Sequence, residues 1–202
     1  MLDLLDWKRR VTALYAEVRA TADPRAAWQR WRAVRRELIH THPQSPIRDP
    51  AARASFDGPW YFEHDPGARV TAEVQGAEPG RVVVEGSADG RFEMTRVGTA
   101  RFELYGQAAA LGIYWVEGYG GGLFLSFRDA TSGSETYGAG RYLLDTVKGA
   151  DLGYEDGRLV LDFNLAYQPS CSYDAVWACP LAPPENRLSI GVRAGERVRP
   201  EP

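Results

Sequence analysis

Residues 126–142 concentrate polar side chains whose types suit the binding of an anion. An apolar stretch leads into an Arg-Asp pair, a loop of small and hydroxyl-bearing residues follows, and a glycine-rich return ends in Arg-Tyr. This pattern predicts a β-hairpin with Arg128 and Arg141 near its opposite ends. Because a guanidinium group can hold a carboxylate or phosphate through two parallel hydrogen bonds, both arginines could converge on one anion. Thr131, Ser132 and the loop amides could complete the site.

The same hairpin is also consistent with a purely structural role. Asp129 would then cap the turn through side-chain hydrogen bonds, and each arginine would pair with a nearby carboxylate, such as Asp129, Glu135 or Asp162. Composition does not separate the two interpretations, so both stay open at this point.

A second polar cluster, residues 161–188, contains a strand that ends near Asn164 and a proline-braced loop with Tyr167. The two clusters together supply the ligand-binding residues that we predict: arginines hold charge, while tyrosines and Asn164 shape a pocket and donate hydrogen bonds. These residues are Arg128, Asp129, Thr131, Ser132, Tyr137, Arg141, Tyr142, Asn164 and Tyr167. No catalytic residue is assigned, although Ser132 or Tyr137 could transfer a proton. Nothing in the sequence identifies a cofactor.

Both cysteines of the chain, Cys171 and Cys179, lie in this second cluster. Their spacing matches neither a C-x-x-C redox pair nor a zinc ribbon. They could be quiet thiols, form a disulfide, or supply two thiolates to a metal with His42 as a third ligand. The loop offers few further ligands, and a disulfide benefits a small secreted domain most. We therefore expect reduced, metal-free cysteines that lie close enough to be oxidised together.

Several enzyme classes lack their motifs in this chain. There is no G-x-x-x-x-G-K-[ST] loop, no G-x-S-x-G elbow and no H-E-x-x-H helix. The glycine-rich run 118–122 fails the G-x-G-x-x-G spacing at Leu123. The histidines are His40, His42 and His64. A Ser-His-Asp triad therefore has no local motif to support it.

Composition is that of an ordinary globular protein, with 202 residues of which 44% are hydrophobic and 25% charged. No apolar run approaches the roughly 20 residues that span a bilayer, and the first residues lack the order of a signal peptide. We therefore expect a soluble, cytoplasmic protein with no membrane contact. Residues 1–53 carry 11 basic and 6 acidic side chains, and the remainder carries 13 and 21. The net charge of −3 disfavours nucleic acid as a partner.

Two helices must precede the polar clusters in the chain. Apolar residues recur at helical spacing from Leu4 to Val18, and Asp23-Pro24 has the order of a cap followed by the first residue of a second helix. One apolar stripe on this second helix consists of Trp28, Trp31, Val34 and Leu38. A cluster of prolines after it forms an extended connector.

Beyond Phe56 the hydrophobic pattern changes to a period of two, which predicts strands. The predicted strands are 60–63, 69–74, 81–85, 91–96, 100–105, 111–116, 123–128, 140–144, 159–163 and 188–192. Turn residues such as Glu78-Pro79-Gly80 separate them. Many short strands without interleaved helices favour an antiparallel β-barrel or coiled sandwich. The predicted fold is therefore α+β and mainly β, with two N-terminal helices packed on the β-rich part. Residues 1–50 form the helical pair with its connector, 51–196 the β-rich body and 197–202 a loose tail.

The sequence resembles an uncharacterised bacterial and archaeal family, the domain of unknown function numbered 1684. The resemblance rests on residues 42–46, 56–62, 96–102, 127–142 and 161–188, and thus extends over most of the chain. Pro59 is a departure, since such proteins have Leu at this position. The resemblance implies no established reaction. It does imply that the hairpin and the cysteine-containing loop belong to one shared architecture.

Two functional hypotheses follow from the sequence. In the first, a pocket near the Arg128/Arg141 hairpin binds a small anionic or polar molecule. In the second, the basic helical head docks a protein partner without any catalysis. A pocket with convergent polar groups would favour the first hypothesis, and an exposed apolar patch around Trp28 and Trp31 would favour the second. The sequence leaves the oligomeric state open.

Overall fold

The computed structural model describes residues 2–88, 90–118 and 120–200. The helices are α1 (Leu2–Ala20), α2 (Pro24–Thr41) and α3 (Pro50–Ser55). The strands are β1 (Trp60–Tyr61), β2 (Arg69–Glu85), β3 (Arg91–Leu104), β4 (Gln107–Val116), β5 (Gly122–Phe127), β6 (Arg141–Asp145), β7 (Tyr154–Glu155), β8 (Arg158–Asp162) and β9 (Glu196–Arg197). The structure is mainly β with N-terminal helices, and this confirms the predicted fold class.

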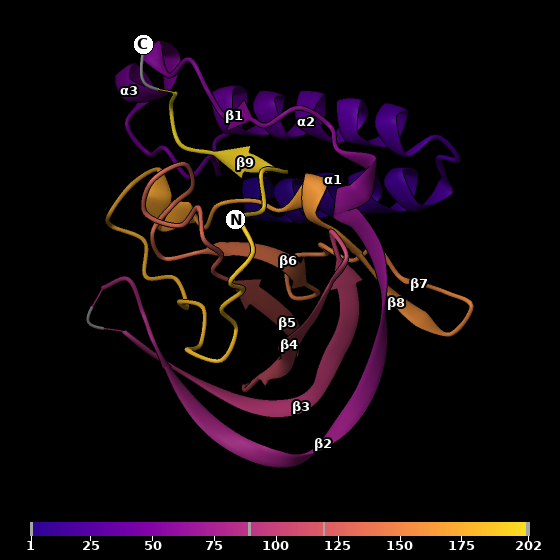
Figure 1. Ribbon diagram of the computed structural model, residues 1–202. Coiled ribbons are helices and arrows are strands. Elements are labelled where there is room, and N and C mark those ends of the chain that lie inside the picture. The colour runs from indigo at the N-terminus through magenta and orange to yellow at the C-terminus, as the bar shows by residue number, and fades with distance from the viewer. Residues whose placement is uncertain (1, 89, 119, 201–202) are drawn as a thin grey trace.

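The strands form one large antiparallel sheet and one small one. The large sheet has seven strands in the order β6-β5-β4-β3-β2-β8-β7, and β1 pairs with β9 in the small sheet. Strands β2 and β3 sweep in a wide curve below the helices (Figure 1). The sheet does not close into a barrel, because β6 and β7 stand at its opposite ends and do not pair with each other within the described residues.

Helices α1 and α2 form the helical head of the molecule, and α2 attaches this head to the sheet. Asp23 caps α2 by accepting a hydrogen bond from the backbone N–H of Arg25, and Pro24 occupies its first turn. The predicted tryptophan stripe is buried and shares one core cluster with sheet residues that include Met94 and Tyr114. No helix in the described part of the chain is long and apolar enough to cross a membrane.

The predicted turn at Glu78-Pro79-Gly80 is an irregularity inside β2. Gly76 lies opposite Gly98 and Gly80 opposite Arg96, so three residues of β2 face a single residue of β3. Proline is tolerated at such a bulge, where no ladder hydrogen bond has to be donated. The predicted strands 69–74 and 81–85 are therefore one long strand, and 91–96 and 100–105 likewise merge into β3.

A second correction concerns the end of the chain. The strand predicted over 188–192 is wrong, since this segment has no regular structure. Arg197, which the sequence places in the loose tail, instead belongs to β9 and pairs with Trp60. The backbone N–H of Val198 also donates to the carbonyl of Glu135. The chain is thus tied to the body up to Val198.

We predict that Trp31→Ala lowers the free energy of unfolding by roughly 3–5 kcal/mol, as large truncations in a core do. Trp31 is 1% exposed, and its indole N–H donates to Tyr15 Oη over 3.3 Å. Urea denaturation measures the loss. The control is Leu5→Ala, at a side chain of the same helical head that is 45% exposed, where little change is expected. An unchanged denaturation midpoint for Trp31→Ala would contradict the docking of α2 on the sheet.

Candidate functional site

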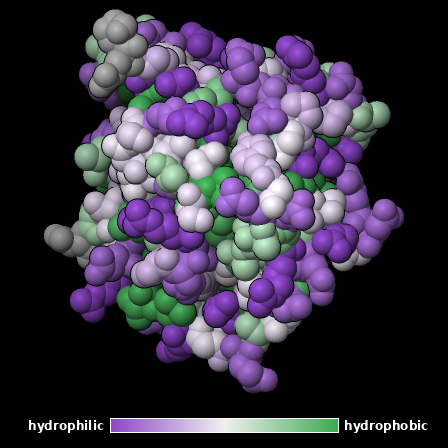
Figure 2. Space-filling view, in the orientation of Figure 1, coloured by the Kyte–Doolittle hydropathy of each residue, from purple (hydrophilic) through white to green (hydrophobic). Residues whose placement is uncertain are grey.

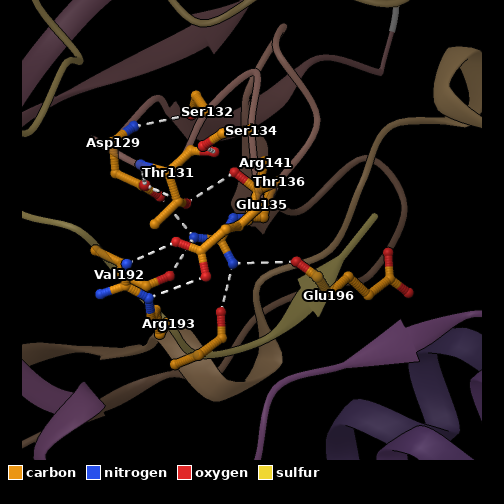
Figure 3. Close-up of polar contacts among 11 residues, drawn as sticks. Asp129, Thr131, Ser132, Ser134, Glu135, Thr136, Arg141, Val192, Arg193 and Glu196 are labelled. Atoms are coloured by element: carbon orange, nitrogen blue, oxygen red, sulfur yellow. Dashed lines mark hydrogen bonds and ion pairs between the residues drawn. The ribbon is translucent and has the colours of Figure 1, made fainter. Parts of the chain in front are cut away.

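Arg141, one of the two arginines predicted to hold an anion, is buried with 1% of its surface exposed. Its Nη2 donates to Asp129 Oδ2 over 2.6 Å and to the carbonyl of Val192 over 2.9 Å. Its Nη1 donates to the carbonyl of Glu196 over 3.1 Å and to that of Ala194. Figure 3 shows these contacts converging on the guanidinium group. Burial lowers the pKa of Arg141, while the nearby carboxylate of Asp129 opposes this shift. Protein acceptors therefore occupy both Nη atoms of Arg141, while its Nε is buried without a hydrogen-bond partner among the described residues.

A glycine immediately before Arg141 allows the sharp turn that positions the guanidinium group. Gly140 has a φ of +97°, and an added Cβ would lie 2.4 Å from the carbonyl oxygen of Phe127. Only glycine fits this left-handed, crowded position. The chain can thus turn immediately before Arg141 and bring the first residue of β6 against the end of β5.

The polar side chains of the hydroxyl-rich loop form hydrogen bonds within the loop itself. Asp129 Oδ1 accepts hydrogen bonds from the backbone N–H and the hydroxyl of Thr131. Thr131 Oγ1 lies 3.0 Å from Thr136 Oγ1, and Ser132 Oγ accepts from the backbone N–H of Asp129 over 3.0 Å. For Asp129, Thr131, Ser132 and Arg141, the structural interpretation of the hairpin therefore describes the arrangement.

Among the described residues, the Arg128 side chain shares none of the hydrogen-bond acceptors of Arg141. The Arg128 backbone pairs with Asn186 and Leu188, and its side chain lines a cavity of about 500 Å³ together with Arg187 and Glu85. Its Nε is buried without a hydrogen-bond partner among the described residues. The two arginines do not form one anion site, because protein acceptors occupy both Nη atoms of Arg141 and the Arg128 side chain lines a cavity that Arg141 does not line.

The remaining predicted residues divide into those that bond internally and those that line cavities. Tyr142 Oη donates to the carbonyl of Pro180 over 2.7 Å. Asn164 holds the backbone N–H and carbonyl of Asp65, each over 2.8 Å. Tyr137 and Tyr167 line two further cavities. Of the nine predicted residues, only Arg128, Tyr137 and Tyr167 line a cavity, and each lines a different one.

The Tyr167 cavity, of about 200 Å³, lies between the helical head and the β-rich body. Its basic lining residues are Arg35 and Lys148. Each is paired with a carboxylate, because Arg35 contacts Glu196 and Lys148 lies 3.3 Å from Asp145. The two basic residues of this cavity are therefore neutralised, and the larger part of its lining is apolar.

The Tyr137 cavity has a volume of about 260 Å³ and a different charge. Its lining includes Arg197 and Arg199 and, within the described residues, no Asp or Glu. Arg197 lies with its guanidinium carbon 4.7 Å from the centre of the Phe62 ring, and its Nε is buried without a hydrogen-bond partner in the described part of the chain. Arg199 reaches Asp57 over 3.3 Å in an exposed ion pair. The other lining residues are Ile47, Ala52, Phe56, Pro59, Trp60, Gln168, Ser172, Tyr173 and Val198.

The sequence analysis missed Glu196, which is fully buried. Its carboxylate accepts hydrogen bonds from Arg35, from the backbone N–H of Gln168 over 2.6 Å and from Tyr173 Oη over 3.0 Å. The carboxylate also raises the pKa of Arg35, against the effect of burial. No periodic pattern surrounds Glu196. The Gly195-Glu196 pair is the only local signal, since Gly195 has a φ of +79°.

Cys171 and Cys179 are free and buried. The backbone N–H of Cys171 donates to Cys179 Sγ over 3.3 Å, and Tyr137 Oη donates to Cys171 Sγ over 3.6 Å. Hydrogen bonding from Cys179, with smaller contributions from Ser87 and Tyr137, lowers the pKa of Cys171 to about 6. The same pairing raises the pKa of Cys179. The two thiols are therefore unequal in acidity.

A metal site of the kind weighed for these cysteines would need further ligands. In the described ranges, no group of three or more His, Cys, Asp or Glu side chains is arranged to hold a metal ion. Both ring nitrogens of His42 are engaged, Nε2 with Asp6 Oδ2 over 3.1 Å and Nδ1 with the backbone N–H of Gln44 over 3.0 Å. His42 is thus part of the helical head.

The fold and the hairpin define a class of protein: an open, curved antiparallel sheet under an N-terminal helical pair, with a buried arginine that fastens the C-terminal segment. The chain belongs to the family described as "Protein of unknown function (DUF1684)", whose model matches residues 54–197. The solution NMR structure of an uncharacterised protein of Haloarcula marismortui is similar, with 39% sequence identity and a TM-score of 0.60. That match covers 84% of this chain and 91% of the other. No curated protein matches the sequence.

We predict that Asp129→Ala destabilises the protein by about 3–5 kcal/mol, because it leaves the Arg141 guanidinium buried without its counter-ion. Chemical denaturation measures the effect. The matched control is Glu135→Ala in the same hairpin, which removes an ion pair with the exposed Arg193 and should have only a small effect. Equal losses for both variants would show that the buried pair has no special role.

Proposed function

We propose that this protein binds a small organic anion in the Tyr137 cavity. One observation carries the proposal: Arg197 lines the cavity without an ion-pair partner among the described residues, beside Arg199, which pairs with Asp57 outside the lining. The Nε of Arg197 is also buried without a hydrogen-bond partner among the described residues. A buried donor without an acceptor costs about 1–3 kcal/mol, so the protein leaves part of the hydrogen-bonding capacity of this guanidinium group unused.

The other side chains of the cavity suit an anion attached to a flat apolar body. Burial, together with its contact to Cys171, raises the pKa of Tyr137 to about 12. The phenol is therefore protonated at neutral pH, and in the reduced protein it donates its single proton to Cys171 Sγ at the edge of the cavity. Phe56 and Trp60 provide aromatic surface. Ligand sites for drug-sized molecules have volumes of roughly 300–1,000 Å³, and a cavity of about 260 Å³ fits a smaller molecule.

The other cavities support this function less well. Glu85 lies in the wall of the Arg128 cavity beside its two arginines. In the Tyr167 cavity, Glu196 and Asp145 already neutralise the two basic residues. The proposal keeps the ligand class inferred from the sequence, a small anionic molecule. The proposed site is the cavity beside Tyr137 instead of a position between Arg128 and Arg141.

We do not propose the alternative of a partner-binding helical head. An exposed apolar patch around Trp28 and Trp31 would have favoured that hypothesis, and both side chains are buried in a core cluster shared by α1, α2 and the sheet.

We predict that benzoate and related aromatic carboxylates bind the protein and raise its melting temperature. Arg197→Gln should weaken this binding roughly tenfold or more, because a hydrogen bond to a charged group contributes about 1.5–3 kcal/mol. Isothermal titration calorimetry at low and moderate salt measures the affinity, which should fall as salt rises. Arg197→Lys should have an intermediate effect, since it keeps the charge but loses the planar fork.

The matched control is Arg193→Gln, at an exposed arginine of the same C-terminal segment that pairs with Glu135 outside the cavity. Its affinity for benzoate should match that of the wild type. The proposal fails if no carboxylate or phosphate binds the wild-type protein, or if Arg193→Gln weakens binding as much as Arg197→Gln does.

A further inference from the structure

The two cysteines stand at the ends of a loop whose ends are both fixed. Cys171 lies in a short 3₁₀ turn, Ser170–Ser172. At the other end, Cys179 exchanges hydrogen bonds with Ser87, since its N–H donates to Ser87 Oγ over 3.0 Å and its carbonyl accepts from the N–H of Ser87 over 3.0 Å. Cys179 Sγ thereby rests 3.3 Å from the backbone nitrogen of Cys171. The two thiols are also hydrogen-bonded to each other, so their sulfur atoms are already close.

The surroundings make the two thiols different. Tyr137 and Cys179 hydrogen-bond to Cys171 and favour its thiolate, so the pKa of Cys171 falls to about 6. The pKa of Cys179 rises, so Cys179 keeps its proton at neutral pH. The thiolate is the reactive form towards peroxides, and redox-active cysteines commonly have a second cysteine beside them. The pair therefore has an attacking member and a resolving member.

Cys171 lies behind the linings of two neighbouring cavities and belongs to neither lining. Ser170 lines the Tyr167 cavity and Ser172 lines the Tyr137 cavity, so the buried Cys171 sits between the two. Tyr137, which contacts Cys171 Sγ, itself lines the second cavity. A hydroperoxide that enters the Tyr137 cavity is one side chain away from the thiolate.

We propose that Cys171 and Cys179 form a thiol–disulfide site that is oxidised by hydroperoxides. The thiolate of Cys171 attacks the peroxide: an S–O bond forms, the O–O bond breaks, and the leaving oxygen takes up a proton as water or an alcohol. The thiol of Cys179 then loses its proton and attacks the sulfenic acid. An S–S bond forms, the S–O bond breaks, and water leaves. Two thiols lose two electrons and two protons, and one peroxide is reduced. This proposal goes beyond anion binding and does not depend on it.

The test treats the folded, reduced protein with hydrogen peroxide and maps its peptides by mass spectrometry. We expect one intramolecular disulfide between Cys171 and Cys179, a mass lower by two hydrogens, and full recovery with dithiothreitol. In Cys179→Ser the reaction should stop at the sulfenic acid of Cys171, which dimedone traps. Cys171→Ser should react at least tenfold more slowly, because burial still raises the pKa of Cys179 and this thiol lacks the hydrogen bond from Tyr137. Oxidation that requires denaturation, or that joins two chains instead, would overturn the proposal.

A second readout separates a redox role from a packing role. Alkylation of Cys171 by iodoacetamide should titrate with a midpoint near pH 6 in the wild type. Tyr137→Phe removes one donor to the thiolate, so the midpoint should rise. The ionisable groups that act on this pair are Tyr137, Tyr142 and Lys148, besides the cysteines themselves. A midpoint near the ordinary thiol range of about 8.5 in the wild type would contradict the assignment of Cys171 as the attacking group.

Discussion

The buried ion pair of Arg141 and Asp129 is the constraint on which the C-terminal half of the molecule depends. A guanidinium group withdrawn from water needs a counter-ion and an acceptor for its remaining donors, or its desolvation would cost several kcal/mol. Asp129 supplies the counter-ion at the end of β5. The carbonyls of Val192, Ala194 and Glu196 accept from the two Nη atoms. The irregular segment that leads into β9 is thereby held in one path across the body.

Glu196 extends this arrangement to the helical head. Its backbone carbonyl accepts from Arg141, while its carboxylate binds Arg35 of α2. One residue of β9 thus joins two buried charge clusters on opposite sides of the strand. The same carboxylate fixes Gln168 and Tyr173, which form the common wall of the Tyr137 and Tyr167 cavities. Figure 1 shows β9 between α2 and the sheet, and Figure 2 shows hydrophilic side chains over much of the surface in this view. The carboxylate of Glu196 thus holds the two residues that separate the Tyr137 cavity from the Tyr167 cavity.

Local patterns predicted much of the fold, and long-range contacts account for what they missed. Helical spacing and the Asp23-Pro24 cap act within one element, so α2 could be recognised from sequence. The Pro79 bulge could not, because a turn and a bulge use the same residues and differ only in whether the flanking strands continue along one partner. The residues around Arg141 were correctly singled out as unusual. Their function was ambiguous, because an arginine that binds a ligand and one that binds backbone carbonyls have the same sequence signature.

Tyr137 connects the two proposed activities through a single hydroxyl. In the reduced protein this hydroxyl donates to Cys171 Sγ, where a thiolate places a negative charge beside the cavity. A disulfide carries no charge and is a weaker acceptor, so its formation would release the Tyr137 hydroxyl towards the cavity and remove a repulsion. Both changes favour an anion beside Arg197. By linkage, a bound anion would in turn favour the disulfide, since each event makes the other less costly by the same free energy. The shared side chain thus fixes the sign of the coupling: oxidation and anion binding reinforce each other.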